Sequence, residues 1–265
     1  MTQEARSAAK EAGNVAKMKE NLPSLDLFEQ DALQGFANMA QQDLALPFIR
    51  ILGQLSPQVN ERDAKYVKGA KPGMIYNTVT HELYDGVEGI NVIPCYYKRE
   101  YIEWQDRGEG SGAPVAVHDA TSSIINDTTR DTMGKDRLKN GNYLENTASY
   151  FVVICKKDAA ETALITMKST QLKASRNWNS MMNGLKLQGK NGLFTPPMFS
   201  HVYNLKTVQQ SNDKGTWFGW SVSKIGPCTN RAQYEQAKGF ADSVQKGAIE
   251  AKHSKNDEKS EDTPY

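Results

Sequence analysis

Several features that would assign this chain to a protein class are absent from its sequence. Its 265 residues contain no apolar run of about 18, the length that a membrane-spanning helix needs. The N-terminal segment also lacks the apolar core of a secretory signal. We therefore expect a cytoplasmic protein that has no membrane partner.

Cysteine and histidine are scarce as well. Cys95, Cys155 and Cys228 lie far apart, two of them inside strand-like runs, and no CxxC pair is present. The four histidines are equally scattered. This usage is typical of reduced thiols in a cytosolic protein and makes a structural zinc site improbable. We expect neither a metal site nor another cofactor.

The sequence also contains no familiar catalytic motif. A P-loop, a nucleophile elbow and an HExxH motif are all missing. Ser169, Ser175 and Ser180 have no histidine partner nearby in the sequence, and Asp131 and Asp136 lie in a Gly/Asn-rich loop without metal-ligand spacing. We therefore predict a protein that is not an enzyme.

Charge is nearly balanced overall but unevenly distributed. The net charge is only +1, which argues against a strongly basic, histone-like protein. From Lys156 to Lys190, however, seven Lys/Arg residues accompany two carboxylates, a local balance of +5. Residues 257–265 hold four carboxylates and one lysine. Such asymmetry is more informative about partners than the total.

Alternating apolar residues and turn signals predict a mainly β (α+β) protein. We expect an OB-fold-like Greek-key barrel with an inserted helix and flanking terminal helices, and a two-sheet sandwich is the structural alternative. The predicted strands are 44–52, 74–80, 82–85, 89–107, 148–156, 162–168, 198–208 and 216–225, and the predicted helices are 24–39, 169–185 and 230–251.

The longest strand-like segment, 89–107, suggests a ligand. Its first half is apolar, and its second half interleaves four large aromatic residues with Lys98 and Arg99. Because burying an unpaired charge is costly, this half should reach a surface. Single-stranded nucleic acid needs both kinds of residue there, since bases stack on rings and phosphates attract cations. An ordinary amphipathic strand with solvated charges remains the competing interpretation.

The predicted helix 169–185 is a second candidate. Lys168, Lys173 and Arg176 can share one face or the N-terminal edge, where Ser169 is expected to cap the helix. A helix N-terminus attracts phosphate, although solvated cations are equally compatible with the pattern. Trp178 is interpreted as a core anchor. The predicted nucleic-acid-binding residues are Lys65, Tyr76, Tyr97, Arg99, Tyr101, Lys156, Lys168, Lys173, Arg176 and Trp217.

The C-terminal tail is the third candidate. An anionic tail with a terminal aromatic residue can occupy a cationic groove when nucleic acid is absent, or bind a partner protein; a purely solubilising terminus is the alternative. Its candidate partner-binding residues are Asp257, Glu258, Glu261, Asp262 and Tyr265.

Two segments resemble a known family. They are LPFIRILGQLSPQVNERDAKYVKGAKPGMIYNTVTHELYDGVEGINVIPCYYKREYIEW and ASYFVVICKKDAAETALITMKSTQLKASRNWNSMM. Across residues 44–225, the composition of the segments and their order resemble those of the single-stranded DNA-binding proteins of tailed bacteriophages, in particular of N4-like podoviruses. The resemblance implies an OB-type barrel and sequence-independent binding of single strands during phage DNA replication and recombination, in the cytoplasm of the bacterial host. It also implies a tail that recruits replication or transcription proteins.

These expectations define four parts of the chain. Residues 1–42 form a partly disordered helical arm, 43–229 an OB-like single-stranded-DNA-binding domain, 230–250 a C-terminal helix, and 251–265 an acidic disordered tail. RNA is an equally acceptable ligand for stacking platforms, and self-association is left open. A virion structural or assembly protein is the alternative function, and an enzyme of nucleic-acid metabolism with an unrecognised site is a third.

Overall fold

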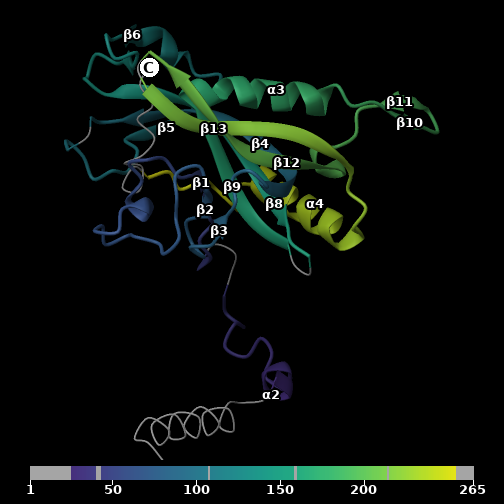
Figure 1. Cartoon of the computed structure of the whole chain (residues 1–265). Coiled ribbons are helices and arrows are strands. Elements are labelled where there is room, and N and C mark those ends of the chain that lie inside the picture. Colours follow the sequence, from purple (N-terminus) through teal and green to yellow (C-terminus); the bar gives the residue numbers. More distant parts are fainter. Residues whose placement is uncertain (1–24, 40–42, 107, 158–159, 214, 255–265) are drawn as a thin grey trace, which may run out of the picture. The chain divides into compact units, whose positions relative to one another are not determined.

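The computed structural model describes residues 25–39, 43–106, 108–157, 160–213 and 215–254 (Figure 1). The chain divides into two units, Met1–Leu44 and Ala45–Tyr265. Residues 1–24 and 40–42 of the predicted arm 1–42, and the four carboxylates of the predicted tail, lie outside the described residues.

The first unit contains the short helix α2 (Leu25–Gln30), none of whose side chains is buried. A longer helix was expected here. The described chain instead leaves the helical conformation at Leu33 and Gly35, whose φ angles are 65° and 87°. Left-handed residues end a helix, so the apolar pattern beyond them does not continue it.

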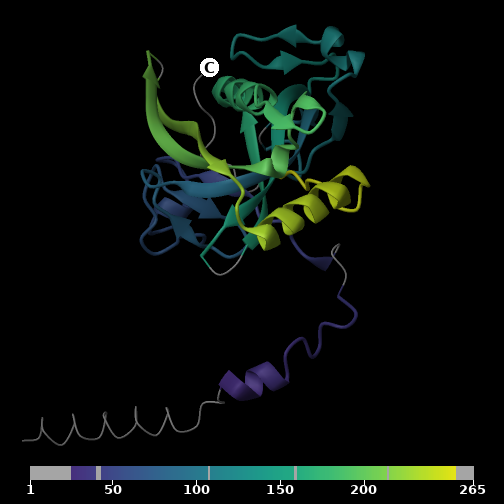
Figure 2. The ribbon, with the colours of Figure 1, turned by 90° about the vertical axis from the view of Figure 1, so that its right-hand side faces the viewer.

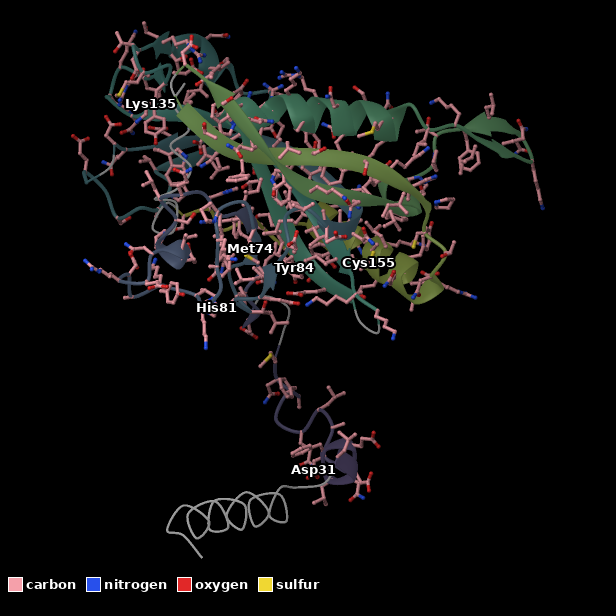
Figure 3. The ribbon with its side chains drawn as sticks, in the orientation of Figure 1. Asp31, Met74, His81, Tyr84, Lys135 and Cys155 are labelled. Carbon is pink, nitrogen blue, oxygen red and sulfur yellow. The ribbon has the colours of Figure 1, made fainter. Side chains whose placement is uncertain are left out.

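The second unit is built on one large antiparallel sheet. Its strands follow the order β13-β12-β4-β8-β7-β6, with β5 also paired to β4 and β9 to β8. Figure 3 shows Lys135 toward one end of the sheet and Cys155 toward the other. The strands are β4 (Ile90–Trp104), β5 (Ala116–Asp119), β6 (Thr129–Arg130), β7 (Asp136–Arg137), β8 (Tyr143–Cys155), β9 (Ala160–Lys168), β12 (His201–Asn212) and β13 (Gly215–Pro227).

The long strand predicted at 89–107 is β4, at the centre of this sheet. Its register with β8 shifts between Pro94 and Tyr96. A bulge is expected at this point, because proline has no N–H with which to continue the ladder. The two predicted hairpins are also present, as β8–β9 and β12–β13.

A helix covers one face of the sheet. Helix α3 (Leu172–Asn183) contributes Trp178 and Met182 to a core that also contains Val92 and Tyr150. The same core receives side chains from a small sheet described below. A short ribbon follows the helix, formed by β10 (Leu187–Gly189) and β11 (Gly192–Phe194).

A second helix, α4 (Arg231–Gln245), covers the opposite face, as Figures 1 and 2 show. Phe240 and Ala241 of this helix pack with Ile93 and Phe151 of the sheet. Because both faces are covered, the strands carry continuous apolar runs and not a simple alternation. This explains the unbroken apolar stretch at the end of β8.

The small sheet is linked to β9 of the large sheet on one side and to β12 on the other. It consists of β1 (Ile49–Ile51), β2 (Ile75–Asn77) and β3 (Leu83–Tyr84). At one end Phe48 forms a parallel bridge with Leu164 of β9. At the other, the Thr207 N–H of β12 donates to the Gly86 carbonyl oxygen at 2.8 Å. Beyond this tether β12 and β13 pair only with each other, and the hairpin curves away (Figure 2).

The segment 108–142, for which the sequence pattern predicts no strand or helix, is folded in its described part. It forms β5, the 3₁₀ turn η3 (Ser123–Asp127), β6 and β7. Arg137 holds it by ion pairs to Asp106 at 2.7 Å and Asp131 at 2.9 Å. These strands have only two to four residues, which is too short for a periodic sequence signal. Ion pairs and pairing with β4 and β8 hold them in place.

The architecture is therefore mainly β, a curled antiparallel half-barrel with few helices. Further 3₁₀ turns are η2 (Pro57–Val59), η4 (Ser169–Gln171) and η5 (Met198–Ser200). Within the described ranges, no helix has both the length and the apolar character needed to cross a membrane.

Candidate functional site

Two of the predicted stacking rings lie inside the protein. Tyr76 is 5% exposed and Tyr101 is 7% exposed. Tyr76 packs with Leu52 in a satellite core beside the small sheet. Tyr101 is paired with His118 of β5, a strand that the sequence did not predict. Neither ring presents a face on which a base can stack in this structure.

Two of the predicted phosphate-binding lysines are engaged in ion pairs. Lys156 lies 2.5 Å from Glu82 and 3.0 Å from Glu161. The hydrogen bond to Glu82 raises the pKa of Lys156 well above its usual range. Lys168 lies 3.4 Å from Glu145. Glu82 and Glu145 lie outside the segment 156–190, so the local charge balance of that segment did not show that they pair with Lys156 and Lys168.

Four predicted residues lie on the side of the sheet that α3 covers. Tyr97 and Arg99 lie on the same face of β4, two residues apart, and Lys173 and Arg176 are exposed on α3 one turn apart. We call this surface the α3 face and include in it Asn179 and Asn183, which share a cavity with Tyr97. Trp217 and Lys65 do not line that cavity.

The cavity beside Tyr97 has a volume of about 210 Å³. Asn179, Asn183 and Thr195 line it together with Tyr97, Tyr203 and apolar residues. Tyr97 is half-buried, and its ring centroid lies 5.1 Å from that of Tyr150. A flat aromatic surface next to amide donors and acceptors can accept a nucleobase.

Helix α3 is fixed to the sheet by its buried side. Trp178 is fully buried, as expected for a core anchor. The Tyr150 hydroxyl lies 2.8 Å from Ser175 Oγ and donates to Asn179 Oδ1 at 2.9 Å. Burial of Tyr150 raises the pKa of its hydroxyl, so it stays a hydrogen-bond donor. These contacts position Asn179 at the cavity.

The predicted cap at Ser169 is not observed. The α-helix begins at Leu172 after a 3₁₀ turn, and no side chain caps either segment. Ser169 instead has a φ of 50°, in the left-handed region. The cavity beside Ser169 is lined by Arg130 and Lys135 but also by Asp136 and Glu145, so it is not a purely cationic site.

Carboxylates are missing from a long stretch around the α3 face. Between Glu161 and Asp213 the sequence has no Asp or Glu. This run extends beyond Lys190, where the locally basic segment described above ends, and it covers α3, the β10–β11 ribbon and all of β12. Its cations are Lys168, Lys173, Arg176, Lys186, Lys190 and Lys206.

Trp217 lies on the β12–β13 hairpin. It is half-buried, and its Nε1 donates to Gln210 Oε1 at 2.9 Å. Trp220 is buried in the core on the other face of the strand. The opposite orientation of these two indoles follows from the period-two geometry of a strand.

The parts of the chain that the structure describes contain no evident metal-binding site. No group of three or more His, Cys, Asp or Glu side chains there is arranged to hold an ion.

Comparison with known proteins gives one match. The model of a family described as Pam3 phage gp34-like protein matches residues 16–250. Neither a curated protein nor a solved structure matches the chain.

Proposed function

We propose that this chain, which belongs to the Pam3 phage gp34-like protein family and is thus a bacteriophage protein, binds single-stranded DNA without catalysing a reaction. The observation that carries the proposal is the α3 face. It combines the Tyr97 ring and two amides in one cavity with the exposed cations Lys173 and Arg176 on a helix that has no carboxylate.

The physical argument concerns both parts of a nucleotide. Lys and Arg on the surface neutralise phosphates and release counterions, which favours any nucleic acid. A ring set in a cavity is accessible only to a base that is not paired and stacked in a duplex. Together these features favour single strands over duplexes, with little dependence on sequence.

We extend the proposal to the context that the resemblance implies. The curled antiparallel sheet would serve as the platform that OB-type barrels provide, and the biological role would be phage DNA replication and recombination. The carboxylates of the C-terminal tail, residues 257–265, would compete with DNA for the α3 face or recruit replication or transcription proteins.

The main test measures fluorescence anisotropy of labelled oligo-dT, with an equal-length duplex as competitor. We expect binding that the duplex does not displace. The Tyr97→Leu variant should weaken binding by about 1–3 kcal/mol, the contribution of one stacked base. Tyr96→Leu is the matched control, because Tyr96 is also half-buried but packs on the α4 side of the sheet. Equal affinity of the two variants would remove Tyr97 from the interface.

The tail has its own test. Truncation after Lys255 should raise oligo-dT affinity if the tail competes for the α3 face, and substitution of its four carboxylates by amides should have the same effect. If neither change alters affinity, the tail does not compete with DNA.

An assembly role is the second candidate, and one observation favours it. The β10–β11 ribbon exposes Leu193 and Phe194, at 71% and 47%. Regular oligomers in light scattering, together with indifference to oligonucleotides at low salt, would support a virion assembly protein over a DNA-binding one.

A further inference from the structure

Residues 25–39 of the first unit, which we call the α2 segment, expose large apolar side chains. Each of the following is at least 48% exposed: Leu25, Leu27, Phe28, Leu33, Phe36 and Met39. In α2 the helical period places the three apolar side chains on one side and Asp26 and Glu29 on the other. A helix of six residues is marginally stable in water by itself, and packing of its apolar side on another surface normally supplies most of its stability.

The α2 segment is also acidic. Between Lys19 and Arg50 the sequence has five carboxylates and no Lys or Arg. Asp26, Glu29 and Asp31 are exposed in the described part of this stretch. Unlike charges around an apolar contact favour the encounter of two surfaces and disfavour wrong partners. A surface that binds the α2 segment should therefore be apolar and bordered by cations.

The second unit of the chain carries a surface of this kind on the β10–β11 ribbon. Figure 1 shows the ribbon beyond the end of α3, away from the large sheet. Leu187 and Phe194 are opposite each other in its register and therefore share one face, and they are 38% and 47% exposed. A two-stranded ribbon by itself is marginally stable in water, so covering this face should stabilise it.

Cations border the apolar face of the ribbon. Lys186 directly precedes β10, Lys190 lies in the turn between the two strands, and both are exposed. The Lys186 ammonium donates to Thr195 Oγ1 and is thus held at the base of the ribbon. The ribbon belongs to the stretch between Glu161 and Asp213 that has no carboxylate. Its apolar content and its charge are both complementary to those of the α2 segment.

We propose that the α2 segment of one copy of this chain binds the β10–β11 ribbon of a second copy. The apolar side of α2 covers the face that carries Leu187 and Phe194, and the carboxylates of the segment lie close to the cations at the base and tip of the ribbon. Such an interface is heterologous, because it joins two different surfaces, so a dimer retains one free segment and one free ribbon and can add further copies. No residue that defines the α3 face belongs to either surface, so this self-association does not depend on DNA binding.

The test is sedimentation velocity of the full chain over a range of concentrations and salt. The average mass should rise with concentration and fall when salt is added, because salt screens the charges at the border. Phe28→Asp in the segment and Phe194→Asp in the ribbon should each weaken association at least about tenfold, the affinity equivalent of burying one large apolar side chain. The melting temperature of each variant should stay close to that of the parent chain, which separates a lost interface from a lost fold.

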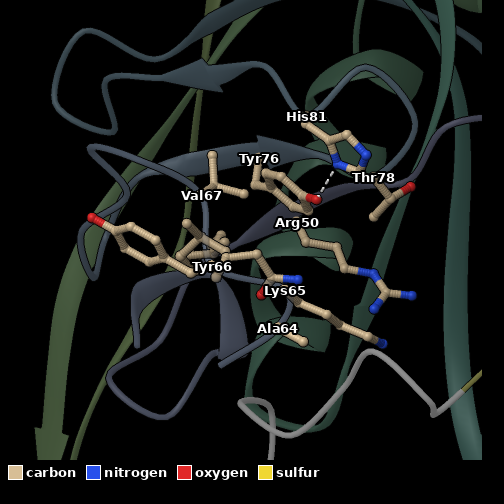
Figure 4. A pocket seen from close by; sticks show the side chains of 11 residues that line it. Arg50, Ala64, Lys65, Tyr66, Val67, Tyr76, Thr78 and His81 are labelled. Atoms are coloured by element: carbon tan, nitrogen blue, oxygen red, sulfur yellow. Dashed lines mark hydrogen bonds between the residues drawn. The ribbon is translucent and has the colours of Figure 1, made fainter. Parts of the chain in front are cut away.

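Leu55→Asp is the matched control. Leu55 is 78% exposed but lies outside both surfaces, in the turn-rich segment after β1. That segment and the small sheet line a cavity of about 350 Å³ (Figure 4). The control variant should associate as the parent chain does.

Mixing the two variants tests the pairing directly. Phe28→Asp retains an intact ribbon and Phe194→Asp an intact segment, so the mixture should form a one-to-one dimer and no larger species. Three outcomes would overturn the proposal: a parent chain that is monomeric at every concentration, a mixture that forms no dimer, or equal loss of association in the Leu55 variant. Both monomeric variants should still bind oligo-dT if the α3 face binds DNA, so failure of one proposal is separable from failure of the other.

Discussion

The indole of Trp178 lies on the ring of Tyr150, with ring centroids 4.3 Å apart and planes inclined by 23°. This contact joins the middle of α3 to the central part of β8. Because both rings are fully buried, it fixes the helix that carries Lys173 and Arg176. The surface cations therefore depend on a buried aromatic pair for their position.

Removing the indole should be strongly destabilising. We expect Trp178→Ala to lower the free energy of unfolding by about 3–5 kcal/mol, because it leaves a cavity in the core and removes the ring pair. Urea denaturation followed by tyrosine fluorescence measures the change. Lys173→Ala on the exposed side of the same helix should change stability by less than about 0.5 kcal/mol. A comparable loss in both variants would contradict the assigned role of Trp178.

The buried carboxylate Glu100 should make stability depend on pH. Burial alone would raise its pKa, but His253 and Lys98 outweigh burial and bring the pKa below its ordinary value of 4.5. Lys98 Nζ lies 2.6 Å from one carboxylate oxygen, and His253 Nε2 lies 3.7 Å from the other. A carboxylate with a lowered pKa stabilises the fold above the unfolded-state value, and this contribution is lost as pH falls through the folded-state value.

The melting temperature of Glu100→Gln, measured from pH 7 to pH 3, tests this. The variant should melt below the parent chain at pH 7, and the difference should shrink as the pH falls below 4.5. A constant difference across the range would show that the ionised form of Glu100 does not contribute.

Gly86 occupies a position where no side chain fits. A Cβ atom there would collide with the Gly73 carbonyl oxygen and with Thr207 Oγ1. Gly86→Ala should therefore separate the small sheet from β12 and lower the free energy of unfolding by about 1–3 kcal/mol or more. Gly226→Ala is the control, because a Cβ atom there meets nothing within 4 Å. Equal thermal stability of the two variants would contradict the tether.

The cations of α3 should determine the salt dependence of DNA binding. On single strands each neutralised phosphate contributes a slope of about −0.7 to a plot of log Kobs against log salt. Lys173→Ala/Arg176→Ala should therefore make the slope shallower by about 1.4. Lys238→Ala/Arg231→Ala removes the same two residue types from the exposed surface of α4, on the other face of the sheet, and should leave the slope unchanged.

The local pattern of the sequence determined most of the secondary structure. Alternation and apolar content placed the strands at 89–107, 162–168 and 216–225, and helical spacing placed the helix that became α3. The opposite orientations of Trp217 and Trp220 followed from the same local geometry. Each of these features depends on residues a few positions apart, so an isolated sequence contains the information.

Only the tertiary structure decided which of those residues reach a surface. Tyr101 is buried where β4 pairs with β5, a strand from a segment without periodicity, and Lys156 is paired with Glu82, which is 74 positions away. Arg50 and Lys65 likewise line one cavity although they belong to different segments of the chain. Burial and charge pairing are properties of contacts between distant segments, and these contacts exist only once the half-barrel has formed.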